Sequence, residues 1–171
     1  MRLTAFNVKQ CGRISVLLVG LLLVASMAAG FFSWQALQKD FKTLEGESYT
    51  WSELSDQWVV VNYFAEWCAP CLREIPELVA FDAAKPADTA LFAVSYDPLT
   101  KSRLTELKEK YQINLPLVVP DEKMVMPMER PPYLPATYII GPDGKVKKTL
   151  MGEVSESLLT ETLEALKSQP L

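Results

Sequence analysis

The stretch WVVVNYFAEWCAPCLREIPEL, residues 58–78, decides the fold of this chain. Its first part, WVVVNYFA at 58–65, is an unbroken run of β-branched and aromatic residues, which is typical of a strand buried on both faces. In the next part, at 72–85, apolar residues recur at helical spacing. Cys68 and Cys71 therefore lie where a buried strand ends and a helix begins.

The remaining sequence predicts four more regions of regular structure and one short extended segment. We expect a buried strand over 90–96, a surface helix over 97–113, an extended segment over 115–121, a hairpin over 136–152 and a final helix over 154–168. Pro76 lies inside the first helix and predicts a kink, and Ser155 is a good N-cap for the last one. This order predicts an α/β fold in which a mixed sheet carries helices on both faces.

Composition excludes several classes of function. The chain has 171 residues, a formal net charge of −4 and no histidine. The acidic balance argues against a nucleic-acid partner. Without histidine, the chain cannot form a Ser-His or Cys-His nucleophile pair or a His-ligated zinc site. The two cysteines of CxxC are too few to hold a structural zinc ion, so we expect no metal and no cofactor.

The first part of the chain has the pattern of a membrane anchor. Basic residues lie within 1–13, and an apolar run over 14–36 is long enough to span a bilayer as one helix. The positive charges predict a cytoplasmic N-terminus, with the domain at 39–171 on the far side of the membrane. A cleaved signal peptide with its cleavage site near 26–28 is the alternative, and it exports the same domain. Cys11 precedes the run and cannot pair with the CxxC.

The two cysteines of the CxxC could form an inert disulfide or a catalytic dithiol. A disulfide that closes so short a loop contributes little to stability. Cys68 precedes the helix, so its sulfur should point outward from the helix N-terminus, where the dipole favours the attacking thiolate. Cys71 lies one turn further on and should be the enclosed, resolving thiol. A CxxC placed in this way is typical of a thioredoxin-like redox site.

Three stretches together resemble a known family. VVVNYFAEWCAPCLREIPEL at 59–78 resembles the active-site segment of the TlpA/ResA-like branch of the thioredoxin superfamily, which is related to AhpC/TSA proteins. LPATYIIGPDGKV at 134–146 resembles its cis-proline segment and hairpin, and FKTLEGESYTWSEL at 41–54 resembles its extra N-terminal strands. The resemblance implies a thioredoxin-like fold, a membrane-anchored thiol-disulfide oxidoreductase of the bacterial envelope, and a reversible Cys68–Cys71 disulfide.

Glu74 is the third candidate catalytic residue. It follows Cys71 by three positions and so lies on nearly the same helical face. A carboxylate there could exchange a proton with the resolving thiol, particularly if burial raises its pKa. The family has a glutamate at this position, whereas Asn62 stands where thioredoxin itself has a buried aspartate. The alternative is an ordinary solvated helix glutamate.

Three further residues are candidates for substrate binding. Trp67 stands beside Cys68 and indicates a docking surface. Pro135 resembles the family's cis-proline, which would place the backbone of Leu134 beside Cys68, free to pair with a substrate strand. A trans proline at the start of a strand is the alternative that the residues themselves leave open.

The dipeptide between the cysteines predicts the direction of electron flow. Ala69 and Pro70 offer no side-chain hydrogen bond, and strong oxidants require a stabilised reduced form. We therefore expect a disulfide reductase that acts on envelope proteins. The resemblance implies a membrane thiol transporter as its electron donor.

Several narrower or rival functions remain open. The reductase could serve cytochrome c maturation by reducing apocytochrome thiols, or it could reduce the cysteines of a copper site. Met124, Met126 and Met128 recur at every second residue and offer thioethers, which are soft ligands suited to Cu(I) in a copper-binding protein. A flexible apolar lip for substrate docking, or plain packing, is the favoured interpretation of these residues. A peroxiredoxin-type peroxidase is disfavoured, because Ala65 stands where that mechanism requires threonine.

Overall fold

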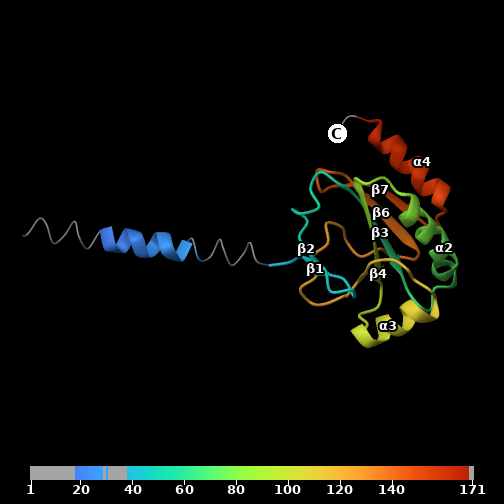
Figure 1. Ribbon diagram of the computed structural model, residues 1–171, viewed down its shortest axis with the longest axis horizontal. Coiled ribbons are helices and arrows are strands. Elements are labelled where there is room, and N and C mark those ends of the chain that lie inside the picture. The colour runs from blue at the N-terminus through green and yellow to red at the C-terminus, as the bar shows by residue number, and fades with distance from the viewer. Residues whose placement is uncertain (1–17, 29, 31–37, 170–171) are drawn as a thin grey trace, which may run out of the picture. The chain divides into compact units, whose positions relative to one another are not determined.

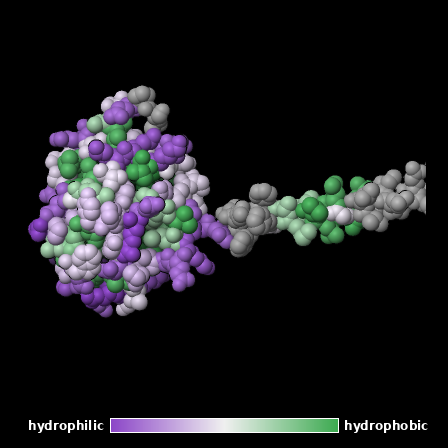
Figure 2. Space-filling view, turned by 180° about the vertical axis from the view of Figure 1, so that it is seen from behind, coloured by the Kyte–Doolittle hydropathy of each residue, from purple (hydrophilic) through white to green (hydrophobic). Residues whose placement is uncertain are grey.

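The computed structural model describes residues 18–28, 30 and 38–169, which belong to two compact units, Met1–Gln38 and Lys39–Leu171. In the first unit, residues 18–28 form a helix with exposed, mostly hydrophobic side chains (Figure 2). Among the described residues, no helix is both long enough and apolar enough to cross a membrane. The predicted anchor over 14–36 lies partly outside these residues.

The second unit is built around one mixed sheet. Its elements are β1 (Phe41–Lys42), β2 (Ser48–Tyr49), β3 (Trp58–Phe64), α2 (Ala69–Ala84), β4 (Thr89–Ser95), α3 (Lys101–Lys110), β5 (Leu117–Val118), β6 (Ala136–Ile140), β7 (Val146–Met151) and α4 (Glu156–Lys167). β1 and β2 form a separate antiparallel pair, and the other strands follow the order β5-β4-β3-β6-β7 (Figure 1). β3 and β5 run parallel to β4, whereas β6 is antiparallel to both β3 and β7. The predicted mixed sheet is confirmed.

β3 occupies the centre of this sheet, and all of its residues are buried. Its β-branched and aromatic side chains suit a strand that is covered on both faces. The register places Asn62 opposite Ala93 of β4 and Thr137 of β6. Because β3 ends at Phe64, the chain leaves the middle of the sheet just before Cys68.

One face of the sheet is covered by α2 and α4 (Figure 1). α2 continues unbroken from Ala69 to Ala84 through Pro76, and its buried side chains pack against β3 and α4. α4 begins as predicted, because the Ser155 hydroxyl accepts a hydrogen bond from the backbone N–H of Leu158 at 3.2 Å.

The opposite face is covered differently, and the prediction of helices on both faces is wrong. Its buried cluster includes Val61, Tyr63 and Phe41, with the methionines of the segment 123–133 packed against it. Among the described residues, no member of this cluster comes from α2, α3 or α4. The crossovers from β3 to β4 and from β4 to β5 step across the sheet in the same direction. Right-handed crossovers then place α2 and α3 on one face, which leaves the other to loops and the β1–β2 pair.

Candidate active site

The CxxC forms a disulfide at the start of α2. The Cys68 and Cys71 sulfurs are 2.04 Å apart and the two Cα atoms are 5.3 Å apart. Cys68 is the N-cap residue, and its sulfur accepts a hydrogen bond from the Cys71 backbone N–H at 3.3 Å. The predicted position of the pair, between a buried strand and the first turn of a helix, is confirmed.

The exposure of Cys68 differs from the prediction. Its side chain was expected to point outward, yet in the disulfide form Cys68 is only 4% exposed and Cys71 is fully buried. The physical reason is local, because the bond to Cys71 and the hydrogen bond from its N–H both draw the Cys68 sulfur toward the helix. The exposed residue is the neighbouring Trp67, whose side chain is 66% exposed.

Glu74 is buried on the inner face of α2, one turn beyond Cys71, with an exposure of 2%. One carboxylate oxygen accepts a hydrogen bond from the Asn62 side-chain amide at 2.8 Å, and the other accepts one from the Val154 backbone N–H at 2.9 Å. Burial raises the pKa of Glu74 to about 7, against the opposing effect of these two hydrogen bonds. The alternative of a solvated helix glutamate is therefore wrong.

Asn62 connects Glu74 to the centre of the sheet. Its amide nitrogen donates to Glu74 and also to the hydroxyl of Thr137, at 3.0 Å. Its carbonyl oxygen is buried and has no hydrogen-bond partner among the described residues. Sequence reasoning identified Asn62 only as a residue that cannot titrate and missed Thr137 and Val154. The hairpin predicted over 136–152 contains Thr137, but the sequence does not indicate that it pairs with Asn62. No local signal indicates Val154, which is 80 residues from Glu74.

A second group of residues positions Trp67 at the surface. The indole N–H of Trp67 donates to the Asp97 carboxylate at 2.8 Å, and its ring meets the Tyr96 ring edge to face, with centroids 6.1 Å apart. The guanidinium of Arg130 lies 3.6 Å from the centre of the same tyrosine ring. The sequence predicted Trp67 but missed Tyr96, Asp97 and Arg130, which the fold brings together from different loops.

The predicted cis proline is present. The peptide bond between Leu134 and Pro135 is cis, and the Pro135 carbonyl accepts a hydrogen bond from the Gly152 N–H at 2.9 Å. Leu134 is partly buried and packs against both core clusters. The pairing of the Leu134 backbone with a substrate stays a prediction.

The chemistry of the site is that of a dithiol, because Cys68 and Cys71 form a disulfide at the N-terminus of α2. A disulfide at a helix N-terminus beside a buried carboxylate can take part in thiol–disulfide exchange, in which a thiolate attacks a disulfide sulfur. Together with the mixed sheet, this site defines a thioredoxin-fold thiol-disulfide oxidoreductase.

The model of the AhpC/TSA family matches residues 34–149, and the chain therefore belongs to this family. The thiol-disulfide oxidoreductase ResA of Bacillus subtilis (strain 168) is 27% identical over 123 residues, which cover 71% of this chain and 68% of ResA. The crystal structure of StoA from Bacillus subtilis matches with a TM-score of 0.62 and 22% identity, covering 71% of this chain and 92% of that one.

A further solved structure has the same fold. The pneumococcal exposed lipoprotein thioredoxin Etrx1 of Streptococcus pneumoniae strain TIGR4 matches with a TM-score of 0.64 and 20% identity, covering 73% of this chain and 96% of that one. These comparisons confirm the predicted thioredoxin-like fold and the thiol-disulfide oxidoreductase activity of the CxxC site.

Proposed function

We propose that the protein is a disulfide reductase of the bacterial envelope. The Cys68 thiolate attacks a substrate disulfide, forms a mixed disulfide and releases one substrate thiol. Cys71 then attacks the Cys68 sulfur, releases the second substrate thiol and leaves the Cys68–Cys71 disulfide. The substrate gains two electrons and the protein loses two.

The observation that carries this direction is the sparse hydrogen bonding of Cys68. Among the described residues, its sulfur has one donor, the Cys71 N–H at 3.3 Å, and the intervening Ala69 and Pro70 add no side-chain donor. A strong oxidant stabilises its reduced thiolate form. Apart from the helix dipole and this one N–H, no described group stabilises a Cys68 thiolate, so the disulfide should be the favoured form and the dithiol a good reductant.

Glu74 is proposed to exchange the proton of the resolving thiol. It lies one turn beyond Cys71 on the buried face of α2, and its pKa of about 7 allows both protonation states near neutral pH. A carboxylate with this pKa can accept the Cys71 proton when the mixed disulfide is resolved and return it when the disulfide is reduced again. Asn62 and the Val154 N–H hold the carboxylate in place for this role.

Substrates are proposed to dock on the surface formed by Trp67, Leu134 and Pro135. The exposed Trp67 ring provides apolar contact area next to the disulfide. The Leu134 backbone, set by the cis bond to Pro135, is proposed to pair with an extended substrate segment. Main-chain pairing of this kind accepts many sequences, which suits a reductase for several envelope proteins.

The proposed location is the outer side of the inner membrane. The basic residues within 1–13 and the apolar run over 14–36 support a single-pass anchor, with residues 39–171 facing the periplasm. A reductase in an oxidising compartment needs a supply of electrons, and we propose a membrane thiol transporter as the donor.

The reduction potential tests the proposed direction. We expect the Cys68–Cys71 pair to have a reduction potential below about −200 mV. The potential is measured at equilibrium with a thiol–disulfide buffer of known potential. A potential of about −120 mV, as in the strong oxidant DsbA, would reverse the proposed direction of electron flow.

Trapping identifies the substrates. A Cys71→Ser variant cannot resolve the mixed disulfide and should accumulate envelope proteins bonded to Cys68. Trapped apocytochromes would assign the protein to cytochrome c maturation, and trapped copper-site proteins would assign it to copper-site reduction. If the reduced variant forms no adduct with envelope proteins in cell extracts, protein reduction is the wrong function.

A further inference from the structure

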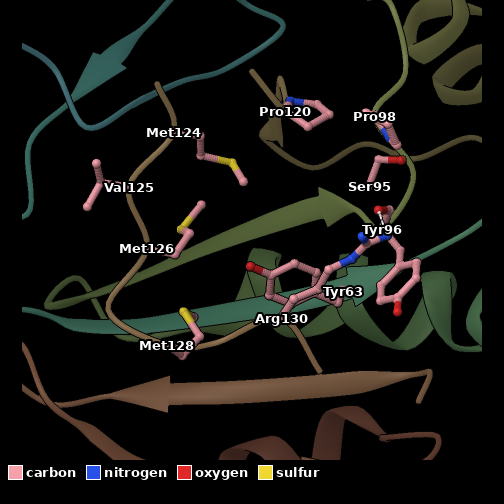
Figure 3. A pocket seen from close by; sticks show the side chains of 10 residues that line it. All are labelled: Tyr63, Ser95, Tyr96, Pro98, Pro120, Met124, Val125, Met126, Met128 and Arg130. Atoms are coloured by element: carbon pink, nitrogen blue, oxygen red, sulfur yellow. Dashed lines mark hydrogen bonds between the residues drawn. The ribbon is translucent and has the colours of Figure 1, made fainter. Parts of the chain in front are cut away.

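The methionine-bearing segment 123–133 lines a cavity on the sheet face that lacks helices. The cavity has a volume of about 500 Å³, and its walls include Met124, Met126, Met128, Tyr63, Tyr96 and Arg130. Figure 3 shows the three methionine side chains pointing into the cavity from the same side of their segment, while Val125 points away from it.

The backbone of this segment is held by two hydrogen bonds at Val125. The Val125 N–H donates to the Asp40 carbonyl at 2.8 Å, and the Val125 carbonyl accepts a hydrogen bond from the Trp51 indole N–H at 2.9 Å. In an extended chain, side chains alternate between the two sides. Anchoring through Val125 therefore directs Met124 and Met126 together toward the cavity.

The thioethers are accessible as well as packed. Met124, Met126 and Met128 are all half-buried, and each packs against the apolar cluster on this face of the sheet. A methionine placed only to fill a core would be enclosed on all sides. These side chains have three rotatable bonds each, so their sulfurs can converge on one small ligand within the cavity.

The donor set of the cavity selects a soft cation. Among the described residues that line it, none is a carboxylate or a cysteine, so the carboxylate ligands that Ca²⁺ and Mg²⁺ sites use are missing, and the side-chain oxygens are neutral hydroxyls. Burial raises the pKa of Tyr63 to about 12, so its phenol is neutral and is a poor hard ligand at neutral pH. Thioethers, by contrast, are ligands that favour Cu(I).

The one charged group in the cavity wall is already engaged. The Arg130 guanidinium lies over the Tyr96 ring at 3.6 Å and donates a hydrogen bond to the Tyr96 carbonyl. Figure 3 shows this guanidinium beside Tyr96, on the side of the cavity away from the methionines. Its charge repels any cation, but at the same distance it repels a monovalent ion such as Cu(I) half as strongly as a divalent one.

We propose that Met124, Met126 and Met128 form a binding site for Cu(I). The site is separate from the CxxC in its ligands, and its existence does not depend on the proposed direction of electron flow. Binding involves no change in oxidation state, since the ion enters and leaves as Cu(I).

The test uses the full-length Cys11→Ser/Cys68→Ser/Cys71→Ser protein, because any free thiol would itself bind Cu(I). Anaerobic titration against a coloured Cu(I) chelator should give one bound ion. Replacing the three methionines together by leucine, which keeps their apolar volume, should weaken binding by at least about tenfold. The three methionines that remain in that variant, at positions 1, 27 and 151, report any non-specific thioether binding.

A second readout keeps the test independent of the folding of the triple variant. With ¹³C-labelled methionine methyl groups, one equivalent of Cu(I) should shift the Met124, Met126 and Met128 signals and leave that of the exposed Met151 in place. Equal shifts at all methionines, or no binding tighter than millimolar, would overturn the proposal. Unchanged affinity in the leucine variant would overturn it as well.

Discussion

The two faces of the central sheet are built for different chemistry. On the helix-covered face, Asn62 of β3 reaches Glu74 of α2 in a fully enclosed polar network. On the other face, the next residue, Tyr63, borders an open cavity whose wall carries methionines. Because successive side chains of a strand point to opposite faces, Asn62 faces the polar network of Glu74 and the next residue, Tyr63, faces the methionine-lined cavity.

This difference shows what burial contributes to each face. The enclosed face excludes water and so raises the pKa of a carboxyl group toward neutrality, which makes it useful for proton transfer. The open face keeps soft, uncharged side chains within reach of small ligands. Changes on the helix face should therefore affect redox catalysis strongly, and changes on the methionine face should not.

The largest effect is expected for Cys68→Ser. Without the attacking thiolate, reduction of a model protein disulfide should fall to the uncatalysed rate. The matched control is Cys11→Ser, which removes the third cysteine of the chain and should leave the rate unchanged. If Cys68→Ser retains activity, the disulfide on the helix-covered face does not take part in the reaction.

A smaller but still large effect is expected for Glu74→Gln. Loss of the proton acceptor should slow the resolution of the mixed disulfide by about a hundredfold, since general acid–base groups contribute this much or more. The rate of the wild type should rise with pH around a midpoint near 7, where Glu74 ionises, and this step should vanish in the variant. The control is Glu161→Gln, which changes an exposed glutamate and should keep the pH dependence of the wild type. If the rise in rate near pH 7 persists in Glu74→Gln, another group is responsible for it.

The same carboxyl group should make stability depend on pH. Its pKa rises from 4.5 to about 7 on folding, so the folded protein holds the proton more tightly than the unfolded chain does. The stabilising contribution of the bound proton is complete below pH 4.5 and is lost as the pH rises through about 7. Its upper limit is about 3 kcal/mol of unfolding free energy. Denaturant unfolding should show this decline in the wild type and a flatter profile in Glu74→Gln. Equal slopes in the two proteins would contradict burial as the cause.

A moderate effect is expected at the rim of the helix face. Trp67→Ala removes an exposed ring that contacts Tyr96, so it should lower stability by less than about 1.5 kcal/mol. The second-order rate with a protein disulfide should fall about tenfold, as at the buried aromatic anchors of interfaces. Reduction of a small aliphatic disulfide should change little. An equal loss with both substrates would argue against docking on Trp67.

The smallest effect on redox activity is expected on the opposite face. Replacement of Met124, Met126 and Met128 by leucine keeps their apolar contacts and should leave the rate of disulfide reduction within about twofold of the wild type. The assay is the same as for Trp67→Ala. A large loss would show that the two faces act as one site.

The helix face could be predicted well from the sequence because its signals are local. The buried run ending at Phe64, the CxxC and the helical spacing after Cys71 are all contained in one stretch. The position of Glu74 on the same helical face follows from that spacing alone. Its second hydrogen bond could not be predicted, since the Val154 N–H comes from the loop before α4.

The alternation of the three methionines could be read from the sequence, but the position of their segment against the sheet could not. Pro127, Pro131 and Pro132 interrupt the segment at 123–133 and prevent a helix there. Its position is instead set by long-range contacts such as the hydrogen bond between Trp51 and Val125, which are 74 residues apart. The burial of Cys68 was missed for a different reason, since it accompanies the bond to Cys71 and the hydrogen bond from the Cys71 N–H.

The most direct test of this account is the ionisation of Glu74 in its buried network. The carboxyl carbon can be followed by ¹³C NMR as a function of pH in the disulfide form, with Glu74→Gln to assign the signal. We expect a midpoint near pH 7, because burial outweighs the hydrogen bonds from Asn62 and Val154. A midpoint near the ordinary glutamate value of 4.5 would contradict it.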